Sequence, residues 1–221
     1  MSDLHFFDPH DDVSKFERRL PHWAQGGVVC FVTWRTIDSI PKAVLRSWQA
    51  ARMSWLRKHG IDPVHANWRA QLQRLGRDVN EAFYRQFSAR WHDELDSCHG
   101  KCLLGQPAVS DIVASALQFG DGSKFELMDF VIMPNHVHFI AAFLLEDEML
   151  SNCASIKHYS ARQINSLLGR KGRFWQQDGF DHLIRSREQF DGFRKYIQNN
   201  PVKARLPEGM FRHWSKQLGD R

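Results

Sequence analysis

The chain has 221 residues, and 43% of them are hydrophobic, which is enough for a sizeable packed core. Eight Trp and 16 Phe argue against a disordered chain, and four Cys are too few for a disulfide-rich scaffold. The formal net charge of +5 is unevenly distributed, because residues 157–205 hold 11 Lys and Arg against four Asp and Glu. A basic last third suits an anionic partner.

The sequence predicts neither a signal peptide nor a membrane span. The first residues, MSDLHFFDPHDD, are acidic and contain no apolar run of useful length. The longest apolar stretch, around residues 139–145, is too short to cross a bilayer. We therefore expect a cytoplasmic protein with no membrane partner.

The first half of the chain predicts one strand followed by helices. Residues 28–36, VVCFVTWRT, are rich in β-branched and aromatic side chains, as strands are. From residue 41 to residue 119, apolar side chains recur at three- and four-residue spacings, which predicts helices. We therefore expect a long helical insertion at 41–119, directly after the first strand.

The second half predicts a hairpin and then a mixture of helices and strands. Residues 125–132 and 136–144 are expected to be antiparallel strands joined by the turn Met133-Pro134-Asn135. A helix, a short strand and a second helix are expected at 151–168, 180–185 and 187–199. The second helix should end at Asn199-Asn200-Pro201, because proline disfavours helix in the residue before it. Runs of helix beside a mostly antiparallel sheet predict an α+β fold.

The strand at 136–144 carries two histidines, in the sequence MPNHVHFI. In a strand, His136 and His138 point to the same side and Val137 points to the other. Two neighbouring imidazoles can hold one metal ion, which would also satisfy two polar rings in an apolar strand. The pattern alone is common, however, and two imidazoles leave a coordination shell incomplete.

The helix at 151–168 offers further polar groups. Tyr159 and Gln163 are four residues apart, so they share one helical face. Basic residues surround Tyr159, which is unusual for a core position. The alternative interpretation is an amphipathic tyrosine that packs its ring and exposes its hydroxyl. Tyr196, in contrast, has apolar spacing with its neighbours in 193–197 and predicts a structural role.

Several segments together resemble one protein family. MPNHVHFI is similar to the HUH motif, histidine–hydrophobic–histidine, of the single-tyrosine HUH transposases. KHYSARQIN, LLGRKGRFWQQDGFDHLIR and YIQNNPVKARL resemble the REP-associated tyrosine transposases, a branch with an IS200-like transposase domain. The resemblance covers residues 18–206 as a single domain, whose basic C-terminal part is 170–206.

This resemblance implies a ferredoxin-like α+β sandwich with an antiparallel sheet. It also implies that His136 and His138 hold a divalent metal, Mg²⁺ or Mn²⁺, with Gln163 as third ligand, where relatives have Gln, Glu or Asn. Tyr159 would attack a phosphate of single-stranded hairpin DNA and form a 5′-phosphotyrosine intermediate. The expected activity is therefore nicking and joining of single-stranded DNA, by a monomer or a homodimer.

Basic residues around and after the tyrosine helix predict the DNA contacts. The candidates are Lys157, Arg162, Arg170, Lys171 and Arg173. Trp175 follows them, either to stack on an unpaired base or to join the core. Two other functions stay open: a domesticated hairpin-DNA or RNA-binding protein of the same fold, and a metal-dependent hydrolase that forms no covalent adduct.

Overall fold

The computed structural model describes residues 4–8, 14–17, 21–145, 148–177 and 179–217. The chain divides into two compact units. One is built from Met1–Ile37 and Lys101–Arg221, and the other is Asp38–Gly100. Within the described ranges, no helix has the length and apolar character that crossing a membrane requires.

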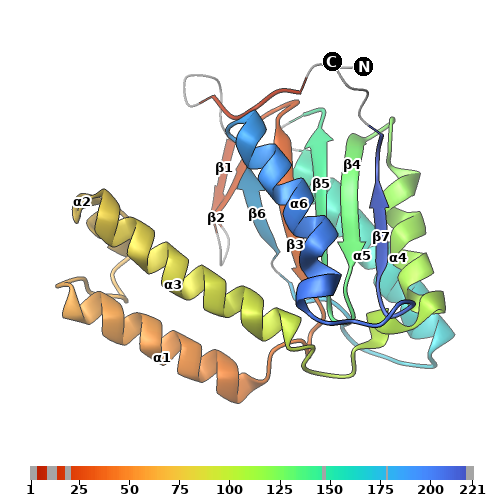
Figure 1. Ribbon diagram of the computed structural model, residues 1–221, viewed down its shortest axis with the longest axis horizontal. Helices are drawn as coiled ribbons and strands as arrows, with labels where there is room; N and C mark the ends of the chain where they lie inside the picture. The colour runs from red at the N-terminus through yellow and green to blue at the C-terminus, as the bar shows by residue number, and fades with distance from the viewer. Residues whose placement is uncertain (1–3, 9–13, 18–20, 146–147, 178, 218–221) are drawn as a thin grey trace. The chain divides into compact units, whose positions relative to one another are not determined.

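A five-stranded antiparallel sheet forms the centre of the first unit (Figure 1). The strands are β3 (Val29–Arg35), β4 (Phe125–Ile132), β5 (His136–Phe143), β6 (Phe180–Leu183) and β7 (Arg212–Ser215). Their spatial order is β6-β3-β5-β4-β7. The central strand β5 is buried along its whole length, because β3 and β4 flank it.

Helices complete the α+β architecture of this unit. They are α4 (Pro107–Phe119), α5 (Glu148–Leu167) and α6 (Arg187–Lys203), with a short 3-10 turn η1 (Leu103–Gly105) before α4. The chain order β3-α4-β4-β5-α5-β6 and the spatial order β6-β3-β5-β4 are those of a ferredoxin-like sandwich. The predicted fold class, with its antiparallel sheet, is confirmed.

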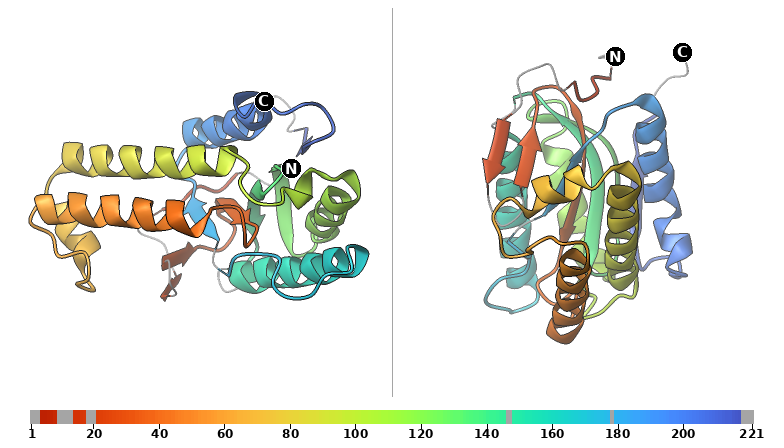
Figure 2. Two further views of the ribbon diagram at one scale, coloured as in Figure 1. Left: turned by 90° about the horizontal axis from the view of Figure 1, so that it is seen from below. Right: turned by 90° about the vertical axis from the view of Figure 1, so that its left-hand side faces the viewer.

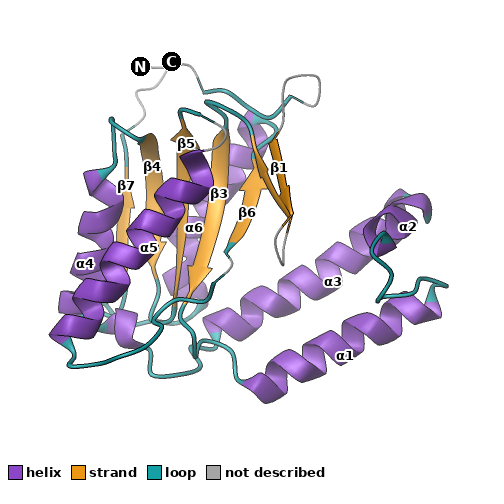
Figure 3. Cartoon of the chain, turned by 180° about the vertical axis from the view of Figure 1, so that it is seen from behind, coloured by secondary structure: helices purple, strands orange, loops and turns teal. Residues whose placement is uncertain are grey.

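The helices cover both faces of the sheet. Helices α4 and α5 lie on one face (Figure 3), and α6 lies on the other, as Figure 2 shows from the side. On the first face, Phe139 of β5 shares a core with Val113 of α4 and Ile156 of α5. On the second face, Ile140 of β5 packs with Ile197 of α6. Successive residues of β5 therefore belong to different cores.

The helical insertion is shorter than the sequence predicted. We expected it to span 41–119, but α4 packs Val109, Val113 and Leu117 into the core of the sheet. These residues form one apolar stripe on α4, and burying that stripe against the sheet is favourable. The separate unit therefore ends at Gly100.

The second unit has its own helices and its own core. Its helices are α1 (Lys42–Lys58), α2 (Trp68–Arg74) and α3 (Arg77–Asp96). Leu56, Leu72 and Phe83 are buried together at its centre. The Arg52 guanidinium lies within cation–π distance of two tryptophan rings of this unit.

Three short strands were not predicted. The hairpin β1 (Ser14–Glu17) and β2 (Pro21–Ala24) forms a separate two-stranded sheet. Strand β7 pairs with β4 at the edge of the main sheet. Each has only four residues, which is too short for a convincing alternation of apolar and polar side chains.

Helix α6 continues beyond the position where we expected it to end. The sequence predicted a stop at Asn199-Asn200-Pro201, whereas α6 runs through Pro201 to Lys203. Proline removes one backbone donor from this turn, but its fixed φ is compatible with a helix. The backbone N–H groups of Ala204 and Leu206 bond to the carbonyls of Asn200 and Pro201, which supports this end. Asn200 therefore lies within the helix.

Candidate functional site

The two histidines of β5 face α6. Ile140 follows them in the same alternation and belongs to the α6 core, whereas Val137 and Phe139 belong to the α4/α5 core. Both imidazoles are fully buried, and their ring centroids are 4.7 Å apart. The prediction that His136 and His138 point together is therefore met by the geometry of the strand.

Hydrogen bonds at Nδ1 orient both rings. His136 Nδ1 lies 2.8 Å from Asn135 Oδ1, and His138 Nδ1 lies 2.8 Å from Thr33 Oγ1 of the neighbouring strand. Because an amide oxygen only accepts, His136 Nδ1 carries the proton and the ring's lone pair is on Nε2. Partners of this kind commonly orient histidines that bind metals.

Tyr196 on α6 contacts the histidine pair. Its hydroxyl lies 3.4 Å from His138 Nε2, and the two ring centroids are 5.2 Å apart. Phe31 packs beside both, stacked on His138 and edge-on to Tyr196. The sequence predicts a structural role for this tyrosine, because of its apolar spacing with Phe193 and Ile197.

Asn200 is buried one helical turn after Tyr196. Four residues separate the two, so they lie on the same face of α6. The Asn200 side chain is 1% exposed, and neither Oδ1 nor Nδ2 has a hydrogen-bond partner among the residues that the structure describes. A buried amide without partners costs free energy, and a bound ion or water is one explanation for such a group. The spacing in YIQNNP was the signal that the sequence interpretation did not use.

The donors on this face fit a divalent cation. His136 and His138 would supply imidazole nitrogens, and Asn200 would supply an amide oxygen from the helix that contacts His138. In the described part of the chain, no three His, Cys, Asp or Glu side chains gather as a metal site. The buried Asn200 amide is the candidate for a third donor on this face.

Tyr159 and Gln163 do not join the histidines, which corrects the grouping expected from the sequence. Helix α5 packs on the face of the sheet opposite to α6 (Figures 2 and 3). The buried side of α5 presents Cys153 and Ile156 to the sheet, whereas Tyr159 is 47% exposed. The thickness of the sheet separates Tyr159 from the imidazoles.

Most of the predicted DNA contacts line one groove along α5. The groove has a volume of about 790 Å³, and Lys157, Arg162, Arg170 and Arg173 border it. The exposed Lys171 lies on the same loop but outside the groove lining. Lys157 has a structural task as well, because its Nζ donates to two backbone carbonyls of the following loop, at 2.6 and 2.8 Å.

Trp175 belongs to the core and does not project from the basic loop. It is 5% exposed, and its indole N–H donates to Ser160 Oγ at 3.0 Å. Its ring packs against Trp34 of β3. The sequence left two interpretations open for Trp175, and the structure supports the one in which Trp175 joins the core.

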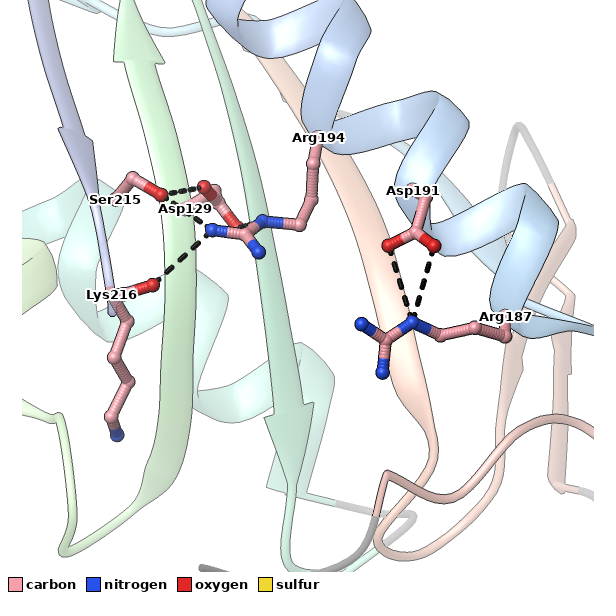
Figure 4. Close-up of polar contacts among 6 residues, drawn as sticks. All are labelled: Asp129, Arg187, Asp191, Arg194, Ser215 and Lys216. Carbon is pink, nitrogen blue, oxygen red and sulfur yellow. Dashed lines mark hydrogen bonds and ion pairs between the residues drawn. The ribbon is translucent and has the colours of Figure 1, made fainter. Parts of the chain in front are cut away.

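An ion pair between a half-buried arginine and a buried aspartate fixes α6 to the sheet. Arg194, two residues before Tyr196, donates through Nε to Asp129 of β4 at 2.8 Å (Figure 4). Arg194 also bonds to Ser215 of β7, which in turn bonds to Asp129. Burial raises the pKa of the Asp129 carboxyl, while Ser215 and Arg194 act in the opposite direction. The network joins α6, β4 and β7.

Comparisons with known proteins give one family and one solved structure. Residues 105–200 match the family described as "Transposase IS200 like", a segment that contains His136, His138, Tyr159 and Tyr196. A solved REP-associated tyrosine transposase bound to a REP hairpin aligns with 86% of this chain and 73% of its own, at 17% identity and a TM-score of 0.41. No curated protein matches the chain. Residues 105–200 therefore resemble the IS200-like transposases, a family of DNA-processing proteins.

Proposed function

We propose that this protein cuts and rejoins single-stranded DNA through a 5′-phosphotyrosine, with Tyr196 as the nucleophile. The observation that carries the proposal is the 3.4 Å distance between the Tyr196 hydroxyl and His138 Nε2, beneath α6. Tyr159, the residue first expected in this role, lies on the opposite face of the sheet. The family match over residues 105–200 supports DNA processing as the general activity.

The metal ligands that we propose are His136, His138 and Asn200. The imidazoles would bind through Nε2, because their Nδ1 atoms are engaged by Asn135 and Thr33. Asn200 replaces Gln163 as the third ligand, since its amide is buried on the helix that covers the histidines. When bound, Mg²⁺ or Mn²⁺ would polarise a non-bridging oxygen of the scissile phosphate.

The tyrosine performs the covalent chemistry. Tyr196 Oη loses its proton and forms a bond to phosphorus, while the bond from phosphorus to the 3′-oxygen breaks and that oxygen leaves as a hydroxyl. A second 3′-hydroxyl reverses the step, gives its proton up and joins a new strand. The phosphate ester energy is retained, so neither ATP nor water is consumed.

The partner that we propose is a single-stranded hairpin DNA. Arg162, Arg170, Lys171 and Arg173 supply cations for its phosphates, and three of these residues border the groove along α5. A guanidinium pairs well with phosphate oxygens because two N–H groups can donate at once. Lys157 contributes mainly by holding the loop that carries the groove wall.

One experiment compares the two tyrosines. A labelled hairpin with a single-stranded flank is incubated with the protein and Mg²⁺ or Mn²⁺, and the products are separated on a denaturing gel. We expect a protein–DNA adduct that Tyr196→Phe abolishes and that Tyr159→Phe, the matched control, retains. Loss of the adduct in Tyr159→Phe alone would falsify the assignment.

The same gel tests the alternative functions. Cleavage without an adduct in the unaltered protein would indicate a metal-dependent hydrolase. Binding without cleavage, in either metal, would indicate a hairpin-DNA or RNA-binding protein that keeps the fold.

A further inference from the structure

Arg35 lies on the catalytic face, at the end of β3. Alternate residues of this strand face α6: Phe31 packs against His138, and Thr33 bonds to it. Arg35 is next in that alternation, and its Cα pairs directly with that of His136. Directly opposed residues of antiparallel strands have Cβ atoms roughly 5 Å apart. The Arg35 side chain therefore starts beside the His136 imidazole.

The backbone around Arg35 is well fixed. The carbonyl of Arg35 accepts a hydrogen bond from the Gln176 N–H at 2.9 Å. The next residue, Thr36, donates its N–H to the Asn135 carbonyl at 2.9 Å. The strand end that carries Arg35 is thus hydrogen-bonded to the turn just before His136, which sets where the side chain begins.

Arg35 brings a half-buried positive charge to this face. Burial lowers the pKa of its guanidinium to about 10, so the group remains a cation at neutral pH. A charge that has lost part of its hydration interacts more strongly with a nearby anion than an exposed charge does. The side chains assigned to the metal, His136, His138 and Asn200, act in neutral form and add no fixed charge.

We propose that the Arg35 guanidinium binds a non-bridging oxygen of the scissile phosphate. This inference rests on the proposed function, which places that phosphate between Tyr196 and the histidines. Negative charge on the phosphoryl oxygens must be stabilised during transfer, and positioned guanidinium groups do this in other phosphoryl-transfer enzymes. Arg35 is then a catalytic residue, distinct from the cations of the groove on the opposite face.

The test removes either the Arg35 cation, by substitution, or the negative charge of the scissile phosphate, by replacing one of its oxygens with a methyl group. Adduct formation is measured in single turnover with a phosphodiester hairpin and with hairpins whose scissile phosphate is a neutral methylphosphonate, one for each diastereomer. We expect Arg35→Gln to slow adduct formation on the diester by about 100-fold, the effect of losing one positioned donor. On at least one methylphosphonate the same substitution should cost less than about tenfold, because the oxygen that Arg35 binds is missing.

The controls separate contact with the phosphate from an effect on folding. Arg187→Gln removes an exposed cation of α6 and should leave both rates unchanged. Arg35→Lys keeps the charge and should recover part of the rate. If Arg35→Gln does not fold, Arg35→Lys replaces it, and its loss of rate on the diester is compared with its loss on the methylphosphonates.

A distinct outcome would overturn this inference alone. An equal loss on the diester and on both methylphosphonates would show that Arg35 does not touch the scissile phosphate. Failure of the proposed function is recognised separately, by an adduct that survives Tyr196→Phe.

Discussion

The two faces of the sheet each carry a tyrosine followed four residues later by an amide side chain. On the α5 face these are Tyr159 and Gln163, on an exposed helical surface among cations. On the α6 face they are Tyr196 and Asn200, beside the fully buried His138. The same spacing therefore occurs twice, and only the direction of the histidine side chains decides which tyrosine meets them.

The surroundings of the two tyrosines explain why the sequence favours Tyr159 as the nucleophile. Tyr159 has basic neighbours, which look like a site for DNA. Tyr196 has Phe193 and Ile197 around it and packs with Phe31, which looks like core. An aromatic enclosure also holds a phenol in one position and excludes water from it, and both favour reaction there.

The largest expected effect comes from comparing the two amides, Asn200 and Gln163. Asn200→Ala removes the proposed oxygen ligand and should reduce adduct formation by about 10- to 100-fold, the range found when metal sites lose a supporting group. Gln163→Ala, on the α5 face, should have no such effect. The measurement is adduct yield as a function of Mn²⁺ concentration, in which Asn200→Ala should need more metal. Equal behaviour of the two variants would contradict the ligand assignment.

The second largest effect concerns the stability of the fold and compares two ion pairs of α6, both shown in Figure 4. Asp129→Asn leaves the half-buried Arg194 without its carboxylate and should lower the free energy of unfolding by about 1–3 kcal/mol. Asp191→Asn breaks the exposed pair with Arg187 and should cost less than about 1 kcal/mol. Urea denaturation of the two variants measures the difference. If the costs are the same, the ion pair does not hold α6 on the sheet.

The smallest effect is expected at the groove. Arg162→Ala combined with Arg173→Ala should weaken binding of single-stranded DNA several-fold and flatten its salt dependence, by roughly 0.7 in the log–log slope for each lost phosphate contact. Lys124→Ala with Arg187→Ala removes two exposed cations outside the groove and is the control. Titrations in the Tyr196→Phe background separate binding from cleavage. An unchanged slope would exclude the groove as a DNA site.

The fold was largely predictable because its signals are local. The hairpin at 125–132 and 136–144 agrees with β4 and β5 to within one residue, since a proline turn and two apolar runs define it. The direction of His136 and His138 relative to each other followed from strand geometry alone. The face that they share did not, because β5 is apolar on both sides and its sequence does not distinguish α5 from α6.

The remaining parts depended on contacts between distant residues. The sequence predicts a helix end at Asn200 because Pro201 follows it, and only the structure shows that Asn200 lies within α6 with its side chain buried. Arg194 finds Asp129 across 65 positions of sequence, which no local pattern indicates. Arg35 lies within the predicted strand 28–36, but its sequence gives no sign of the register that pairs it with His136.

The position of α6 has a consequence for kinetic order. His138 and Tyr196 meet within one chain, and Asn200 follows on the same helix, so under the proposed function every copy carries its own nucleophile and metal ligands. The rate of DNA cleavage should therefore rise linearly with protein concentration. A mixture of His138→Ala chains and Tyr196→Phe chains should be as inactive as either alone, because neither copy can lend its partner what is missing.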